Sequence, residues 1–235
     1  MTDASICLIT FLLSLGWLLL VYGVAQRWHL PPTLSRKVIH VGTGPLFVLC
    51  WPLFSDSAYS RLFAAVVPLG LTLMFVAVGL GWFQLPLLVK ASTRNGDRGE
   101  LLKGPLHYGV AFIWCTLVFW RSSPVGILAL MLLCGGDGLA DIVGRRWGTH
   151  KLPFNSSKSW IGSMAMGLGS AGFGLGFLWW FNQWGYFQPA LTTEGMIIKV
   201  GAIALAATLI EALPLADIDN LTITITAVGL GVALF

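Results

Sequence analysis

The sequence predicts an all-α integral membrane protein whose chain crosses the bilayer several times. Of its 235 residues, 56% are hydrophobic and only 10% are charged, and the mean hydropathy is +0.80. A water-soluble domain of this size needs more polar surface, so a bilayer is the expected solvent. Inside a bilayer the backbone must satisfy its own hydrogen bonds, which favours helices over isolated strands.

Eight apolar runs have a length that spans, or nearly spans, a membrane. They cover residues 5–26, 38–54, 62–83, 106–120, 124–143, 161–181, 197–214 and 221–235. The last run is short, and its segment 222–226 alternates like a strand, but a lone strand in lipid would leave its backbone unpaired. We therefore predict eight transmembrane helices, with seven as the alternative, in a single domain over residues 1–235.

The basic residues predict the orientation, because Lys and Arg are retained on the cytoplasmic side during insertion. With the N-terminus outside, eleven of the fourteen Lys and Arg residues fall on the inner side. Only Arg61, Arg121 and Lys199 then fall outside. The long inner loops, at about 84–105 and 144–160, are also rich in polar residues, so a site that uses a soluble cosubstrate is expected at the cytosolic face.

The net charge of +4 does not indicate a nucleic-acid-binding protein. The basic residues form short clusters between apolar runs and do not line one face. Anionic headgroups and phosphates are therefore the expected partners.

The most informative segment is GGDGLADIVGRR at 135–146. A full crossing of the preceding helix needs residues up to about 143, so Asp137 is expected below the cytosolic interface. A carboxylate there costs roughly 2.5–3.5 kcal/mol and needs a cation or a polar cavity. Asp137 and Asp141 lie four residues apart on one helical face, where both can ligate one divalent cation. The alternative is a set of salt bridges with Arg145 and Arg146 at the helix end.

A second polar segment, KLPFNSSKSWIGS at 151–163, precedes the next helix. Lys158 and Ser159, with the free amides at the start of that helix, predict a phosphate site, because an ammonium and a helix N-terminus both attract anions. The P-loop pattern GxxxxGK[ST] is absent. The alternative is an ordinary helix cap with positive-inside anchoring.

Two segments of the first half contribute further candidates. Arg36, Lys37 and His40 open the second helix, where they either bind phosphate beside the aspartates or act as topology anchors. Glu100 lies in a loop of mixed charge and glycine. That loop is expected to fold over the site, and the alternative is a solvated connector.

Acidic residues gather near the C-terminus. Glu211 ends the seventh predicted helix, and Asp217, Asp219 and Asn220 follow closely. Acids at an inner loop are not topology anchors. We expect them to complete a metal shell or to orient an acceptor hydroxyl.

Five segments in this order resemble the polyprenol kinase family, and most closely the phytol kinases of photosynthetic organisms. They are RKVIHVGTGP at 36–45, GDRGELLKGPLHYG at 96–109, GGDGLADIVGRRWG at 135–148, KLPFNSSKSWIGS at 151–163 and EALPLADIDN at 211–220. The resemblance implies transfer of the terminal phosphate of a nucleotide, typically CTP, to phytol or a similar isoprenoid alcohol in the bilayer. Many relatives have a carboxylate pair before the asparagine, whereas Ile218 separates Asp217 from Asp219 here.

The resulting hypothesis is a multi-pass membrane kinase with its active site on the cytosolic side. Mg²⁺ is expected on Asp137 and Asp141, while Glu211 or Asp219 orients the alcohol and accepts its proton. The nucleotide from the cytosol is expected to contact the following residues: Arg36, Lys37, His40, Glu100, Arg145, Arg146, Lys158 and Ser159. Two alternatives stay open: a cytidylyltransferase that makes a CDP-lipid, and an ion-coupled transporter with intramembrane acids as a relay.

Overall fold

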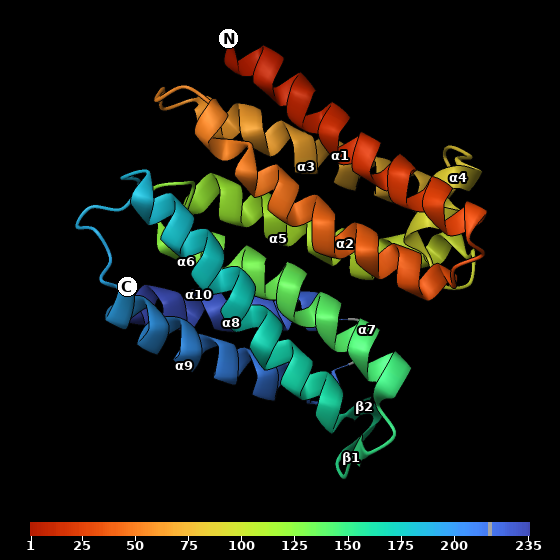
Figure 1. The fold of residues 1–235 in the computed structure, drawn as a ribbon. Coiled ribbons are helices and arrows are strands. Elements are labelled where there is room, and N and C mark those ends of the chain that lie inside the picture. Colours follow the sequence, from red (N-terminus) through yellow and green to blue (C-terminus); the bar gives the residue numbers. More distant parts are fainter. Residues whose placement is uncertain (216–217) are drawn as a thin grey trace. The chain divides into compact units, whose positions relative to one another are not determined.

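The computed structural model describes residues 1–215 and 218–235, and nearly all of its regular structure is helical (Figure 1). The chain forms two compact units, Met1–Leu117 and Val118–Phe235. The helices of the first unit are α1 (Asp3–Arg27), α2 (Pro32–Leu49), η1 (Trp51–Leu53), α3 (Ser60–Leu80), α4 (Pro86–Ser92), η2 (Arg98–Leu102) and α5 (Gly104–Val118).

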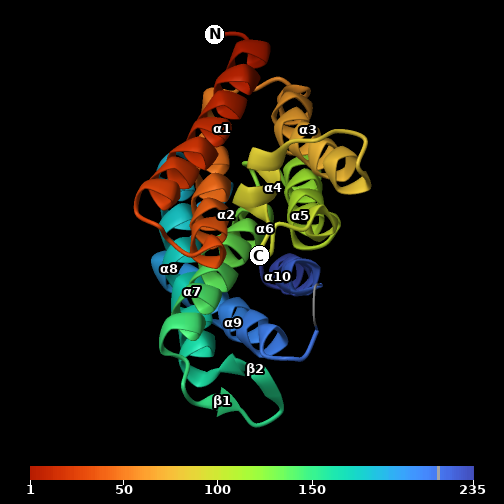
Figure 2. The same cartoon turned by 90° about the vertical axis from the view of Figure 1, so that its right-hand side faces the viewer.

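The second unit contains the remaining helices and one short hairpin. Its elements are α6 (Pro124–Met131), the π-helical turn η3 (Leu132–Asp137), α7 (Gly138–Trp147), β1 (Lys151–Leu152), β2 (Asn155–Ser159), α8 (Trp160–Gln183), α9 (Thr193–Glu211) and α10 (Asp219–Leu234). Figures 1 and 2 both show the hairpin at the end of α8 that begins at Trp160.

The first unit packs around an apolar cluster contributed by every helix from α1 to α4 and by η2. Its buried members are Leu18, Val21, Ile39, Val78, Leu88, Ala91 and Leu101. Close packing of α1 on α2 depends on Gly42, because a Cβ there would lie 2.3 Å from the Trp17 ring. The Trp17 indole also donates a hydrogen bond to the Ile39 carbonyl at 3.3 Å.

The second unit is built around the continuous helical segment α6, η3 and α7. Its most apolar window is 83% buried, far more than that of α8 or α9, which are 33% and 28% buried. The segment contacts α8 along its length, and α6 and η3 also contact α10. A helix that is buried on all sides forms the core of its unit, so residues in its interior, including Asp137, are shielded from water.

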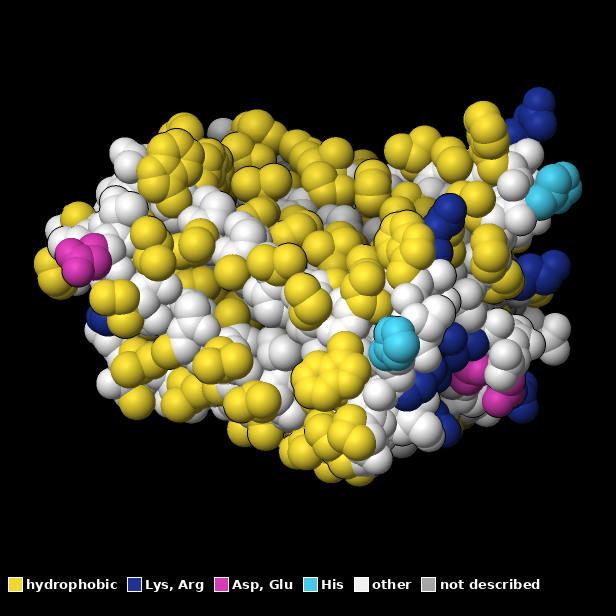
Figure 3. Space-filling view, turned by 60° about the horizontal axis from the view of Figure 1, so that its bottom comes forward, with side chains coloured by type: hydrophobic (Ala, Val, Ile, Leu, Met, Phe, Trp, Pro, Cys, Tyr) yellow, Lys and Arg dark blue, Asp and Glu magenta, His cyan; other side chains and the backbone are white. Residues whose placement is uncertain are grey.

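The fold class that the sequence predicts is confirmed, since every one of the eight apolar runs overlaps a helix. Among the described residues, six helical segments are long and apolar enough to cross a membrane. The run at 221–235 is the shorter apolar helix α10, so the alternating segment 222–226 is helical as predicted. Hydrophobic side chains cover most of the face in Figure 3. The number of crossings stays a prediction.

The helices extend beyond the apolar runs, and one element was not predicted. α2 begins at Pro32 because proline suits the first turn of a helix, so Arg36, Lys37 and His40 lie within it and do not open it. α7 continues to Trp147. Segment 151–159, predicted as loop, forms the antiparallel hairpin β1–β2.

Candidate functional site

Asp137 lies at the end of the π-helical turn η3, inside the central helix of the second unit. The residue is only 2% exposed, and its predicted depth below the membrane interface stays a prediction. The two glycines before it allow close packing against α8. A Cβ on Gly136 would lie 2.2 Å from the Ser170 hydroxyl, and the carbonyl of Gly135 lies 2.5 Å from where a Cβ on Gly169 of α8 would be. Single π-helical turns often occur at functional sites, because they change the direction in which the following side chains point.

Asp141 follows one helical turn later, and its two carboxylate oxygens have different surroundings. Its Oδ1 accepts a hydrogen bond from Arg145 Nε at 2.8 Å, so the salt-bridge alternative is correct for this pair. Its Oδ2 is buried and has no hydrogen-bond partner among the described residues. A buried carboxylate oxygen without a donor is costly, so this oxygen is available to a cation.

Lys158 lies on β2, so its amine is supplied by a strand and not by a helix start. Its Nζ donates a hydrogen bond to Glu211 Oε1 at the end of α9, and the two groups form an ion pair. The Glu211 side chain is 3% exposed and that of Lys158 is 27% exposed. The pair therefore joins two segments that lie 53 residues apart in the sequence.

Three carboxylates act on the Lys158 amine. Burial lowers the pKa of Lys158, but attraction to Glu211, the hydrogen bond to Glu211 and weaker attraction to Asp137 and Asp219 together raise the pKa above its ordinary value. The amine is therefore charged at neutral pH. Asp219 is half-buried at the start of α10, and the predicted candidate Asp217 lies outside the described residues.

Ser159 caps α8, which was the alternative interpretation of this residue. Its Oγ accepts a hydrogen bond from the Gly162 amide at 3.2 Å, and the residue is 3% exposed. A Cβ at Gly148 would lie 2.3 Å from the same oxygen, so the end of α7 packs closely on this cap. One of the helix-start amides that were predicted to be free is thus bonded within the protein.

Arg145 and Arg146 occupy the last turn of α7 and are exposed. A positive charge at a helix C-terminus interacts favourably with the helix dipole. The Arg146 guanidinium lies 5.3 Å from the centre of the Trp147 ring. Both side chains can be reached from solvent, as a nucleotide-binding role requires.

The remaining predicted residues belong to the first unit. Lys37 is 6% exposed, and the His40 ring lies 4.3 Å from that of Tyr108, whose hydroxyl donates to the His40 carbonyl at 3.0 Å. Glu100 accepts a hydrogen bond from the Arg94 amide and so closes the polar loop on itself. Phosphate binding by Lys37, His40, Glu100 and the neighbouring Arg36 stays a prediction.

Comparisons with known proteins decide the family. A probable chloroplastic phytol kinase of Triticum aestivum is 42% identical over 215 residues, which cover 91% of this chain and 71% of the relative. A chloroplastic farnesol kinase of Arabidopsis thaliana is 42% identical over 217 residues, which cover 90% of this chain and 69% of the relative. Phytol kinase 1 of the same plant, also chloroplastic, is 40% identical over 208 residues, which cover 88% of this chain and 68% of the relative. The chain belongs to the phytol kinase-like polyprenol kinase family. No family model and no solved structure matches it.

The carboxylates at Asp137 and Asp141 would suit a magnesium ion whose remaining ligands come from phosphate and water. Among the described residues, no group of three or more His, Cys, Asp or Glu side chains is arranged to hold a metal. Mg²⁺ commonly uses only one or two carboxylates, with phosphate oxygens and waters completing its shell. The open Oδ2 of Asp141 and the buried carboxylate of Asp137 meet this requirement, and magnesium binding itself stays a prediction.

Asn155 is a further buried residue of the site, and the sequence motifs do not single it out. Its Nδ2 donates to the Ala212 carbonyl at 3.0 Å, and its Oδ1 accepts from the Ser157 amide and hydroxyl at 3.2 and 2.6 Å. An asparagine that precedes serines in a polar segment does indicate a local side-chain turn. No sequence pattern indicates that Asn155 also binds the distant Ala212 carbonyl.

Proposed function

We propose that this protein is a membrane-embedded kinase that transfers the terminal phosphate of CTP to phytol or a similar isoprenoid alcohol, with Mg²⁺ as cofactor. The proposal rests on one observation above all. A partly exposed, charged lysine is paired with the buried Glu211 and attracted by Asp137 and Asp219, in a chain whose relatives are named phytol kinase and farnesol kinase.

The two substrates come from different phases, and this arrangement suits both. An isoprenoid alcohol dissolves in the bilayer with its hydroxyl at the interface, while a nucleotide arrives from the cytosol. Glu211 is buried at the end of α9 and Asp137 is buried inside the central helix, while Lys158 is partly exposed on the hairpin. In our proposal the site lies at the boundary between lipid and cytosol, where the alcohol hydroxyl and the nucleotide phosphate can come into contact.

Phosphoryl transfer needs mainly in-line positioning and neutralisation of the phosphate charge. In our proposal Lys158 binds a phosphate oxygen, and Arg145 and Arg146 bind the rest of the nucleotide. Asp137 and Asp141 would hold Mg²⁺, which when bound supplies charge neutralisation at the phosphates. The orphan Oδ2 of Asp141 supports this assignment.

The geometry favours Asp219 over Glu211 as the residue that receives the alcohol proton. Glu211 already accepts a hydrogen bond from Lys158, so its carboxylate is engaged in holding that amine. Asp219 is half-buried at the start of α10 and acts on the same lysine only through weaker attraction. Glu211 then holds the lysine, while Asp219 orients the hydroxyl and accepts its proton late in the transfer.

The test is an assay of purified protein in lipid nanodiscs with phytol or farnesol. Each nucleoside triphosphate is supplied with a labelled terminal phosphate, with Mg²⁺ or with excess EDTA. We expect label in the lipid phase with CTP and Mg²⁺, and none with EDTA. Label transfer without an added divalent ion would contradict the metal assignment, and absence of transfer with every nucleotide and alcohol would contradict the kinase proposal.

A further inference from the structure

Two contacts join the hairpin to the end of α9, and they use adjacent residues of that helix end. The Lys158 amine binds the Glu211 carboxylate, and the Asn155 amide donates to the Ala212 carbonyl at 3.0 Å. Asn155 and Ser159 are buried, whereas Ser156 and Ser157 between them are exposed. β2 is thus held at both of its ends, with Lys158 next to the second one.

The hairpin has little internal structure to hold it in place. β1 contains only Lys151 and Leu152, and the pairing with β2 is irregular between these two residues. A short two-stranded hairpin is at best marginally stable by itself. The position of Lys158 therefore depends on contacts with neighbouring helices more than on the strand pairing.

We propose that Asn155 is a positioning residue that holds Lys158 against Glu211 and thereby fixes the amine for the nucleotide phosphate. The inference rests on the proposed function for its catalytic consequence, but not for the structural link. The amide is suited to this role because it donates to Ala212 and accepts from Ser157 at the same time. Aspartate has the same size but lacks the donor, so it would face the Ala212 carbonyl with a second acceptor.

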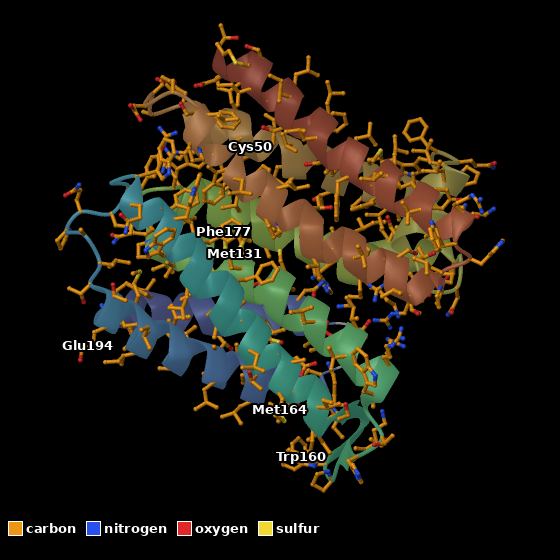
Figure 4. The ribbon with its side chains drawn as sticks, viewed as in Figure 1. Cys50, Met131, Trp160, Met164, Phe177 and Glu194 are labelled. Carbon is orange, nitrogen blue, oxygen red and sulfur yellow. The ribbon has the colours of Figure 1, made fainter. Side chains whose placement is uncertain are left out.

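The chain provides a matched control in Asn182 near the end of α8. Its Nδ2 donates to the Leu191 carbonyl at 2.9 Å, and its Oδ1 accepts from the Leu191 amide at 2.8 Å. This residue lies 22 positions beyond Trp160, about 33 Å along the helix. Figure 4 likewise places Trp160 and Glu194, which lies close after Leu191 in the chain, at opposite ends of the second unit. Asn182→Asp therefore removes the same kind of bond far from Lys158.

The first readout is structural and needs no enzyme activity. Lysines are labelled briefly with an amine-reactive reagent and quantified by mass spectrometry, with the exposed Lys151 of the same hairpin as reference. A lost hydrogen bond with an orphaned acceptor changes a local equilibrium by roughly 5–100-fold. We expect Lys158 to label at least about fivefold faster in Asn155→Asp than in wild type or in Asn182→Asp, because the amine leaves Glu211.

The second readout is kinetic. In Asn155→Asp we expect kcat/KM for the nucleotide to fall by roughly 5–100-fold while KM for the alcohol stays within about twofold. Asn182→Asp should lower only the melting temperature. If Asn155→Asp does not fold, Asn155→Ser is the second variant, because serine is smaller and can still donate a hydrogen bond through its hydroxyl. We expect it to change Lys158 labelling and nucleotide kcat/KM in the same direction by a smaller factor.

Unchanged Lys158 labelling in Asn155→Asp would overturn the inference. Equal losses of nucleotide kcat/KM in Asn155→Asp and Asn182→Asp would overturn it as well, since the effect would then be one of general stability. If wild-type protein transfers no phosphate, the proposed function fails. The labelling experiment still decides whether Asn155 holds Lys158.

Discussion

Lys158 is the residue on which the proposed phosphate contact depends. We expect Lys158→Ala to lower kcat/KM for the nucleotide by roughly 10–1,000-fold, with KM for the alcohol near normal, because a charge-assisted contact is lost in a shielded site. Lys158→Arg should rescue only part of this loss, since a guanidinium is a planar fork and an ammonium is a compact charge. Steady-state kinetics with each substrate varied separately provide the measurement.

The ion pair with Glu211 makes a stability control necessary. Removing one partner of a buried pair costs about 3–5 kcal/mol, and less is expected here because the Lys158 side chain is 27% exposed. The double variant Lys158→Ala with Glu211→Gln no longer contains a buried unpaired carboxylate, so its melting temperature should recover while nucleotide kcat/KM stays low. Recovery of both quantities would show that Lys158 is a structural anchor only.

The two aspartates of the central helix carry the metal hypothesis. Asp137→Asn keeps the size of the side chain but removes the charge that a hard cation needs. We expect turnover to fall at least about 100-fold and the Mg²⁺ concentration for half-maximal activity to rise in Asp137→Asn, with a smaller change in Asp141→Asn. Glu194→Gln, in the first turn of α9 at the other end of the unit, is the matched control. Near-normal turnover of folded Asp137→Asn would end the metal assignment.

At the scale of residues, the sequence predicts which helix carries a residue better than which partner that residue binds. The helical position of Asp137 follows from the number of residues that a crossing needs, and the place of Glu211 follows from the length of its apolar run. The pairs Lys158–Glu211 and Asn155–Ala212 do not follow from any local pattern. They join segments more than fifty residues apart, whose contact is decided by how α8 and α9 pack.

At the scale of elements, the close contact of α8 with the central helix is testable. A Cβ at Gly169 would lie 2.5 Å from the Gly135 backbone carbonyl, which cannot rotate away as a side chain can. Gly169→Ala should therefore destabilise the protein by about 1–3 kcal/mol. Gly172, also on α8, has no atom within 4 Å of the added Cβ, so Gly172→Ala should be neutral within about 0.5 kcal/mol. Thermal unfolding in detergent compares the two, and equal effects would contradict the packing.

Elements differ in how visible they are in the sequence. All eight helical runs could be predicted, because a bilayer demands long apolar segments. The hairpin could not, because β1 has only two residues and the side chains of Asn155 and Lys158 on β2 bond to residues more than fifty positions away. The π-helical turn that ends at Asp137 could not be predicted either. In a helix that is buried on all sides, nearly every residue is apolar, so one extra residue in a turn leaves no mark on the apolar pattern.

At the scale of the whole molecule, the predicted orientation has a direct test. Asn95 and Thr149 are exposed residues of the two polar segments that hold most basic residues. A cysteine introduced at either position, with the four native cysteines replaced, should react with an impermeant thiol reagent only from the cytosolic side. A cysteine at Glu194 should react only from the opposite side. Labelling of Asn95 or Thr149 from outside would overturn the topology.

Family membership and the pairing of Lys158 with Glu211 support transfer of phosphate alone to a lipid alcohol. The most direct measurement uses CTP that carries one label in the terminal phosphate and a different label in the cytidine ring, incubated with the nanodisc-embedded protein, phytol and Mg²⁺. We expect only the phosphate label to enter the lipid and CDP to be released in equal amount. Cytidine label in the lipid, with release of pyrophosphate, would contradict it and identify a cytidylyltransferase.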